Sequence, residues 1–107
     1  MPVAITVLYP QTSDATFDLD YYLSSHMPFV QEKFGPHGMT GYRVAKLVGT
    51  ATGDESPHSV CCTLEFGSVE EFQNALKAEA GPVLGDVKNF SNKDPVLLVG
   101  DVVGSGP

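Results

Sequence analysis

One stretch of the sequence, residues 17–34, has the pattern of an amphipathic helix with a titratable residue on its apolar side. A helix turns by about 100° per residue, which places four residues on one narrow stripe: Leu19, Leu23, His26 and Val30. An apolar stripe must be buried against another element, so the imidazole of His26 is expected to face the interior. The stretch therefore predicts a buried histidine between a helix and the surface on which that helix packs.

The ends of this helix carry clear signals. Asp18 is a good N-cap, and its carboxylate suits the positive end of the helix dipole. Phe17 before the cap and Tyr22 after it have the spacing of a hydrophobic staple. Residues 35–38 contain two glycines and a proline that stop the helix, with Gly35 placed for the C-cap.

Pro28 interrupts the helix from within. It has no N–H to donate to the carbonyl of Ser24, and it pushes Met27 away from helical geometry. We therefore expect a kink or a new helix start near Met27. Such a break would leave the Ser24 carbonyl free close to His26.

Four further stretches read as strands and one as a second helix. The strands are rich in β-branched or alternating apolar residues and are expected over residues 3–9, 41–48, 58–66 and 95–103. Residues 49–57 are polar and contain glycine, which suits a hairpin loop. Ser68 and Glu71 form a capping box for the second helix, which Gly81 and Pro82 are expected to end. Residues 83–90 read as a short extra helical turn.

The order strand, helix, strand, strand, helix, strand predicts an α+β fold of the ferredoxin-like βαββαβ kind. Its four-stranded antiparallel sheet would carry both helices on one face. Because both faces of the first strand are almost entirely apolar, the second face also needs a cover, and another copy of the sheet in a twofold homodimer is the simplest one. The length suits a single domain over residues 1–107, with residues 104–107 as a frayed tail.

Composition excludes several classes of function. The net charge of −7, with only six lysines and arginines, argues against nucleic acid and against an anionic membrane surface. No apolar run has membrane-spanning length, and residues 1–10 lack the basic region of a signal peptide. The two cysteines, Cys61 and Cys62, are neighbours that point to opposite faces of a strand, so no disulfide and no zinc site is expected. A reducing, cytoplasmic location fits best.

Several short motifs together resemble the EthD family. They are Tyr9-Pro10, Phe17-Asp18, Tyr21-Tyr22, His26-Met27-Pro28 with Val30, and the segment 86–90 followed by Pro95. The resemblance spans nearly the whole chain and implies a dimeric α+β barrel, in which two ferredoxin-like subunits pair sheet to sheet. It also implies a pocket between the helices and the sheet of each subunit. The wider relatives include isomerases, polyketide cyclases, dehydratases, decarboxylases and cofactor-free monooxygenases, so the resemblance narrows the architecture more than the reaction.

His26 is the candidate catalytic residue. An imidazole in a half-apolar pocket can act as a general acid or base near neutral pH. The alternative is a structural histidine that hydrogen bonds to a backbone carbonyl. Tyr9 and Tyr22 are candidates for binding a substrate oxygen, or else pack in the core with their hydroxyls at its rim.

Four other residues complete the predicted substrate-binding set. Leu23 and Val30 lie on the apolar stripe beside His26, and Phe90 falls in a segment placed to cover the pocket mouth. His58 opens the third predicted strand, where it either enters the cavity or belongs to the loop. No metal site and no flavin, haem or dinucleotide motif is present, because Gly35, Gly38 and Gly41 lack the fingerprint spacing.

Two classes of function follow. The first is a cofactor-independent enzyme, of the isomerase or lyase type or a cofactor-free oxidase, that acts on a small hydrophobic carbonyl, lactone or phenolic compound in a catabolic or polyketide pathway. Such reactions need little beyond a positioned acid or base. The second is a non-catalytic accessory protein that binds a hydrophobic compound for a P450-type oxygenase in the degradation of a xenobiotic.

Overall fold

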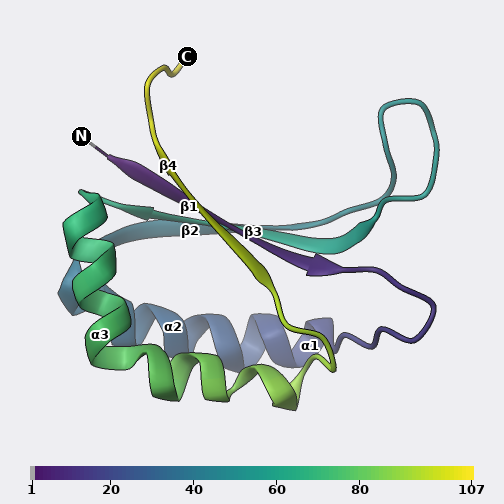
Figure 1. The fold of residues 1–107 in the computed structure, drawn as a ribbon, viewed down its shortest axis with the longest axis horizontal. Helices are drawn as coiled ribbons and strands as arrows, with labels where there is room; N and C mark the ends of the chain where they lie inside the picture. The colour runs from purple at the N-terminus through teal and green to yellow at the C-terminus, as the bar shows by residue number, and fades with distance from the viewer. Residues whose placement is uncertain (1) are drawn as a thin grey trace.

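A four-stranded antiparallel sheet carries two long helical segments on one of its faces (Figure 1). The computed structural model describes residues 2–107. The strands are β1 (Val3–Pro10), β2 (Met39–Lys46), β3 (His58–Phe66) and β4 (Val96–Asp101). The helical elements are α1 (Leu19–Tyr21), η1 (Tyr22–His26), α2 (Met27–Phe34), η2 (Gly35–His37), α3 (Val69–Gly85) and η3 (Val87–Asn89). The predicted βαββαβ order is confirmed.

The sheet has the strand order β2-β3-β1-β4, so β1 is central and β2 and β4 form the edges. Residues of β1 alternate strictly between buried and partly exposed along the strand. The buried positions pair with buried positions of β3 across the ladder, as Ile5 does with Leu64 and Val7 with Cys62. These side chains face the helices and form the floor of the core, because successive residues of a strand point to opposite faces.

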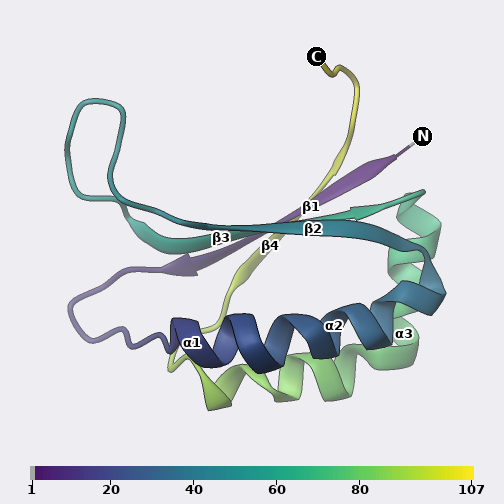
Figure 2. The same ribbon diagram turned by 180° about the vertical axis from the view of Figure 1, so that it is seen from behind.

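The other face of the sheet is open. Views from the front and from behind show both helical segments on the same side and no helix of residues 2–107 over the opposite face (Figure 2). Ala4, Thr6 and Leu8 of β1 are partly exposed there. The edge strand β4 is exposed along its whole length, including Val96 and Leu98, which pair with Leu8 and Thr6.

The first helical segment begins as expected. The side chain of Asp18 accepts a hydrogen bond from the backbone N–H of Tyr21 at 3.0 Å, and the rings of Phe17 and Tyr22 lie 5.1 Å apart between centroids. Pro28 is accommodated by a widened π-helical turn, η1, in which the N–H of Met27 bonds to the carbonyl of Tyr22. A new element, α2, does start at Met27, directly after the π-turn. The expectation that Pro28 pushes Met27 out of helical geometry was wrong, because Met27 keeps helical dihedral angles (φ −66°, ψ −40°).

The helix α2 ends at Phe34 with Gly35 as its C-cap, as predicted. Gly35 keeps helical dihedral angles and the chain continues as the short turn η2. Gly38 ends the turn with a φ of 110°, in the left-handed region where glycine carries no steric penalty. A Cβ at Gly38 would also meet the carboxylate of Glu71, which would have to shift, so the backbone conformation is the main reason for glycine at this position.

The prediction that Gly81 and Pro82 end the second helix was wrong. Ser68 caps α3 as expected, by accepting a hydrogen bond from the N–H of Glu71 at 3.1 Å. The helix then continues through Pro82 to Gly85. Burial of Val83 in the core, with 5% of its surface exposed, accounts for this continuation, because tertiary packing offsets the hydrogen bond that Pro82 cannot make.

Candidate functional site

A small cavity lies between the helices and the sheet. Its volume is about 40 Å³, which is room for roughly three water molecules. Most of the wall is apolar and is contributed by β1, β3, β4 and both helical layers, with Val7, Val30, Leu64, Leu76, Val87 and Leu97 among its residues. The lining residues with polar or ionisable side chains are His26, Tyr9, Tyr22 and Cys62.

His26 lies in the π-turn and is almost completely buried, with 4% of its surface exposed. Its Nδ1 atom lies 2.9 Å from the Oδ2 atom of Asp86, which follows the second helical segment, α3. Within residues 2–107, no group hydrogen bonds to Nε2. The second ring nitrogen is therefore the one available to a molecule in the cavity.

Asp86 directly follows α3 and is held by three donors. In addition to His26, the hydroxyl of Tyr21 donates to Oδ1 at 2.7 Å, and the side-chain amide of Asn89 donates to the same oxygen at 2.8 Å. The side chain of Asp86 is 16% exposed. It lines, with Tyr21 and Asn89, a groove on the outer side of the helices, so the carboxylate lies between this groove and the buried imidazole.

The electrostatics favour a neutral imidazole beside an ionised carboxylate. Burial lowers the pKa of His26, and the hydrogen bond and charge of Asp86 oppose that shift only in part. Burial acts to raise the pKa of Asp86, but the hydrogen bonds from Asn89, His26 and Tyr21 outweigh it and lower the pKa. An ionised carboxylate can only accept hydrogen bonds, so the proton of the neutral ring lies on Nδ1 and the lone pair on Nε2.

Tyr9, Tyr22 and Cys62 stay protonated at neutral pH. Burial raises the pKa of both tyrosines well above the ordinary value. Burial also raises the pKa of the Cys62 thiol to about 11, which leaves it a poor nucleophile because the thiolate is the reactive form. The phenol of Tyr22 hydrogen bonds with Tyr9 and with Cys62, so an oxygen atom of a ligand would replace one of these contacts when it accepts from a phenol.

The structure brings together some of the predicted binding residues and separates others. Tyr9, Tyr22 and Val30 line the cavity with His26. Phe90 is buried rather than placed at a mouth, and its ring packs on His26 with the centroids 4.5 Å apart.

Leu23 and His58 do not line the cavity. Leu23 is 48% exposed, because the π-turn rotates it away from the face that carries His26. His58 pairs with Pro10 at the start of β3 and is partly exposed, so it belongs to the loop end of the hairpin.

The residue that sequence reasoning missed is Asp86. Asp and Asn near the end of a helix suggest turn and capping roles, and nothing in residues 86–90 marks the carboxylate as the partner of a buried histidine. Only the packing of the end of α3 against η1 reveals the pair. The one usable signal was the buried histidine itself, since a buried imidazole needs a hydrogen-bonding partner.

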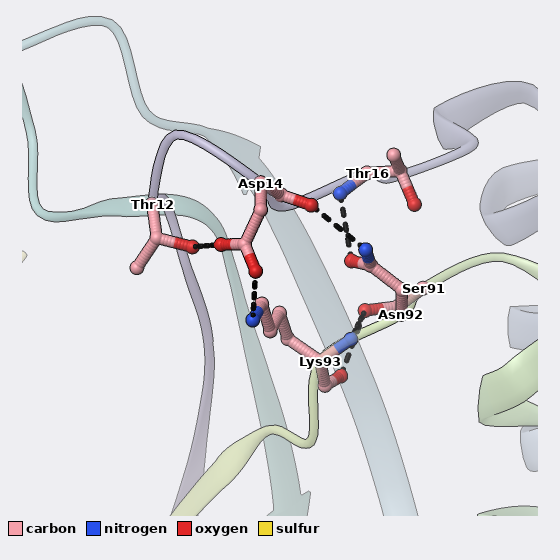
Figure 3. A network of polar contacts seen from close by, with 6 residues as sticks. All are labelled: Thr12, Asp14, Thr16, Ser91, Asn92 and Lys93. Carbon is pink, nitrogen blue, oxygen red and sulfur yellow. Dashed lines mark hydrogen bonds and ion pairs between the residues drawn. The ribbon is translucent and has the colours of Figure 1, made fainter.

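A second polar cluster fixes the loops at one end of the site (Figure 3). The carboxylate of Asp14 accepts hydrogen bonds from Thr12 at 2.6 Å and from Lys93 at 2.8 Å. The amide of Asn92 donates to the backbone carbonyl of Asp14 and accepts from the N–H of Thr16, both at 2.8 Å. These contacts fasten the loop before α1 to the segment that leads into β4.

Comparison with known proteins agrees with this architecture. The sequence profile of the EthD domain matches residues 10–94. The chain belongs to the EthD family. No curated protein matches the sequence. The helices of the described chain all lack the combination of length and apolar character needed to span a bilayer.

Solved structures of EthD proteins superimpose over almost the whole chain. An EthD-like protein from Ralstonia eutropha is 33% identical, with a TM-score of 0.88 over 98% of this chain and 95% of that one. An EthD family protein from Bacillus halodurans is 25% identical, with a TM-score of 0.71 over 94% and 98%. SnoaB, a cofactor-independent oxygenase from Streptomyces nogalater, is 9% identical with a TM-score of 0.66 over 99% and 96%, and shares the fold alone.

Proposed function

We propose that this EthD family member is a cofactor-independent enzyme that moves a proton on a small, largely apolar carbonyl, lactone or phenolic compound, with His26 as the general acid or base. The observation that carries the proposal is the His26–Asp86 pair: His26 lines an apolar cavity, and its Nε2 has no hydrogen-bond partner within residues 2–107. Because the pKa of His26 is lowered, its imidazole is mostly neutral at neutral pH and can accept a proton.

The remaining polar groups of the cavity suit the same chemistry. Removing a proton next to a carbonyl builds negative charge on its oxygen, and a donor beside that oxygen stabilises the charge. Tyr9 and Tyr22 supply hydroxyls in the same cavity wall and keep their protons at neutral pH. Isomerisation and dehydration next to a carbonyl both use this combination of a base and an oxyanion donor.

A substrate of this class is larger than a cavity of about 40 Å³, so binding requires part of the wall to move. The least buried wall residues are Leu84 of α3, which is 46% exposed, and Leu97 of β4, which is 36% exposed. Both side chains are exposed, so a rotamer change there costs less than one in the buried core. We therefore place the entrance between the end of α3 and β4.

Proton transfer can be tested before the natural substrate is known. A base in the cavity should exchange acidic C–H protons of bound probes with deuterium from D₂O, which proton NMR follows directly. Suitable probes are 2-tetralone, δ-valerolactone and resorcinol, which represent the three compound classes. We expect exchange above the buffer rate for at least one probe, and its loss in His26→Gln, while His37→Gln retains it.

The control histidine, His37, lies in the turn η2 outside the cavity, so the two variants separate a site effect from a general loss of imidazole. Thermal melting shows whether each variant is folded. If probes bind without exchange and His26→Gln changes only their affinity, the enzyme proposal fails and the protein is a binding or accessory protein. Exchange that survives His26→Gln also overturns it.

We also propose that the open sheet face forms a homodimer. Its central strand and exposed edge present apolar side chains there, among them Leu8, Val96 and Leu98, and a contiguous exposed apolar surface indicates an interaction site. Light scattering at micromolar concentration should give twice the chain mass, and Leu98→Glu should lower it to that of one chain. A single-chain mass for the wild type overturns the proposal.

A further inference from the structure

We propose that Asp86 is a positioning residue that fixes the base form of His26, and that Tyr21 and Asn89 hold the Asp86 carboxylate for this task. The inference rests on the proposed function of His26. The evidence is the convergence of three donors on one carboxylate from α1, η1 and η3, at 2.7, 2.9 and 2.8 Å respectively.

The three donors contact different oxygens of the Asp86 carboxylate. Tyr21 and Asn89 both donate to Oδ1, and only His26 contacts Oδ2. Rotation of the carboxylate would break all three hydrogen bonds at once. Oδ2 is therefore held against Nδ1, and the orientation of the imidazole is set from the side opposite the cavity.

This arrangement also selects the tautomer. Oδ2 accepts the Nδ1 proton, which leaves the Nε2 lone pair toward the cavity. The other titratable groups around the ring are Tyr9, Tyr22 and Cys62 in the cavity wall and Tyr21 behind the carboxylate. All of them are uncharged at neutral pH. Asp86 is then the one charged group among the described neighbours of His26.

Because each oxygen of Asp86 has its own donors, the orientation of the side chain in Asp86→Asn can be predicted. The hydroxyl of Tyr21 and the amide of Asn89 still need an acceptor, so the side-chain oxygen of the introduced asparagine would turn toward them. Its NH₂ group would then face His26 and donate to Nδ1. Nδ1 would lose its proton, Nε2 would gain one, and the nitrogen in the cavity wall could no longer act as a base.

Nitrogen-15 NMR of the imidazole tests the assignment without any substrate, because protonated and unprotonated ring nitrogens have well-separated shifts. We expect protonated Nδ1 and unprotonated Nε2 in the wild type at neutral pH, and the reverse in Asp86→Asn. Deuterium exchange of the active probe should fall by about 10³-fold or more in Asp86→Asn, as for other histidine bases held in the wrong tautomer. Tyr21→Phe and Asn89→Ala, which only loosen the carboxylate, should each lose roughly 3- to 30-fold with the tautomer unchanged.

Asp20→Asn is the matched control, because Asp20 is an exposed carboxylate of α1 that makes no contact with the imidazole. It should leave both the nitrogen shifts and the exchange rate unchanged. A wild-type tautomer in folded Asp86→Asn overturns the inference, whatever the exchange rate. If the tautomer reverses but the wild type exchanges no probe, the positioning role stands and the proposed reaction fails.

Discussion

Replacing Phe90 should destabilise the protein strongly, because this ring lies at the centre of an aromatic cluster that joins the sheet to the helical segments. Five rings surround it at centroid distances of 4.5 to 6.2 Å, namely those of Tyr9, Phe17, Tyr21, Tyr22 and His26. Only 3% of the surface of Phe90 is exposed. The site therefore has little room to collapse around a smaller side chain.

The size of the effect follows from burial and from ring contacts. Truncation of a buried phenylalanine to alanine costs about 3 to 5 kcal/mol, and each aromatic pair adds roughly 0.5 to 1.5 kcal/mol beyond its area. We expect Phe90→Ala to lose about 4 to 5 kcal/mol, a large part of the total for a chain of this size. Phe90→Leu keeps more of the volume and should lose about 1 to 2 kcal/mol, or roughly 4 to 16 °C in Tm.

Urea unfolding followed by circular dichroism measures both variants. Phe29→Leu is the matched control, since Phe29 is only partly buried and its ring packs at the edge of the core, under Lys33. It should lose less than half as much as Phe90→Leu. If Phe90→Ala costs less than about 1 kcal/mol, well below the usual range for such a truncation, or the two leucine variants are equal, the aromatic cluster does not hold the layers together as argued.

Three further predictions concern local features. Ser68→Ala should lower the free energy of unfolding by about 1 kcal/mol by removing the cap of α3, whereas Ser105→Ala in the exposed tail should change it little. In the native protein a thiol reagent should modify Cys61 much faster than Cys62, which is 1% exposed with a pKa of about 11; equal rates would contradict this. Stability should fall as the pH drops below 6.5, because the unfolded chain binds a proton at His26 that the folded chain disfavours. It should fall further below 3.8 as Asp86 is protonated. His26→Gln should remove the loss below 6.5 and reduce the loss below 3.8, because the hydrogen bond from His26 helps to lower the pKa of Asp86.

The fold was largely predictable because its signals are local. Alternating apolar residues gave strands over 3–9 and 58–66, and the structure has them over Val3–Pro10 and His58–Phe66. The strand expected over 41–48 lies at Met39–Lys46 instead, and the last strand is shorter than expected. Strand ends depend on pairing with neighbours, such as that of Met39 with Phe66, which no local pattern contains.

The second helix shows where a local rule was outweighed. Gly-Pro is a strong stop signal, yet α3 passes through Pro82 and brings Asp86 to the end of η1. A helix that ended at Gly81 would not carry this carboxylate to His26 by the same route. The error in the predicted helix end and the failure to predict the partner of the imidazole therefore have one cause, which is tertiary packing along the last turn of α3.

The π-turn explains why the predicted apolar face of the first helix was correct for His26 and wrong for Leu23. In a regular α-helix, residues three and four apart share a face, so Leu23 and His26 were grouped together. In an i→i+5 turn the helix is wider, and residues four and five apart share a face instead. Tyr22, His26 and Met27 accordingly turn inward while Leu23 is exposed.

Pro28 is the residue that makes this turn favourable. A regular helix would press its ring against the carbonyl four residues earlier. The wider turn relieves that contact, and in it Met27 donates to the carbonyl of Tyr22, five residues earlier. The same widening stacks the ring of Tyr22 on that of His26, with 20° between their planes, and aims Nδ1 at Asp86. The proline that appeared to interrupt the helix is thus the reason that a tyrosine and a histidine lie side by side in the cavity wall, and a chain without it would favour a regular helix that turns one of the two away.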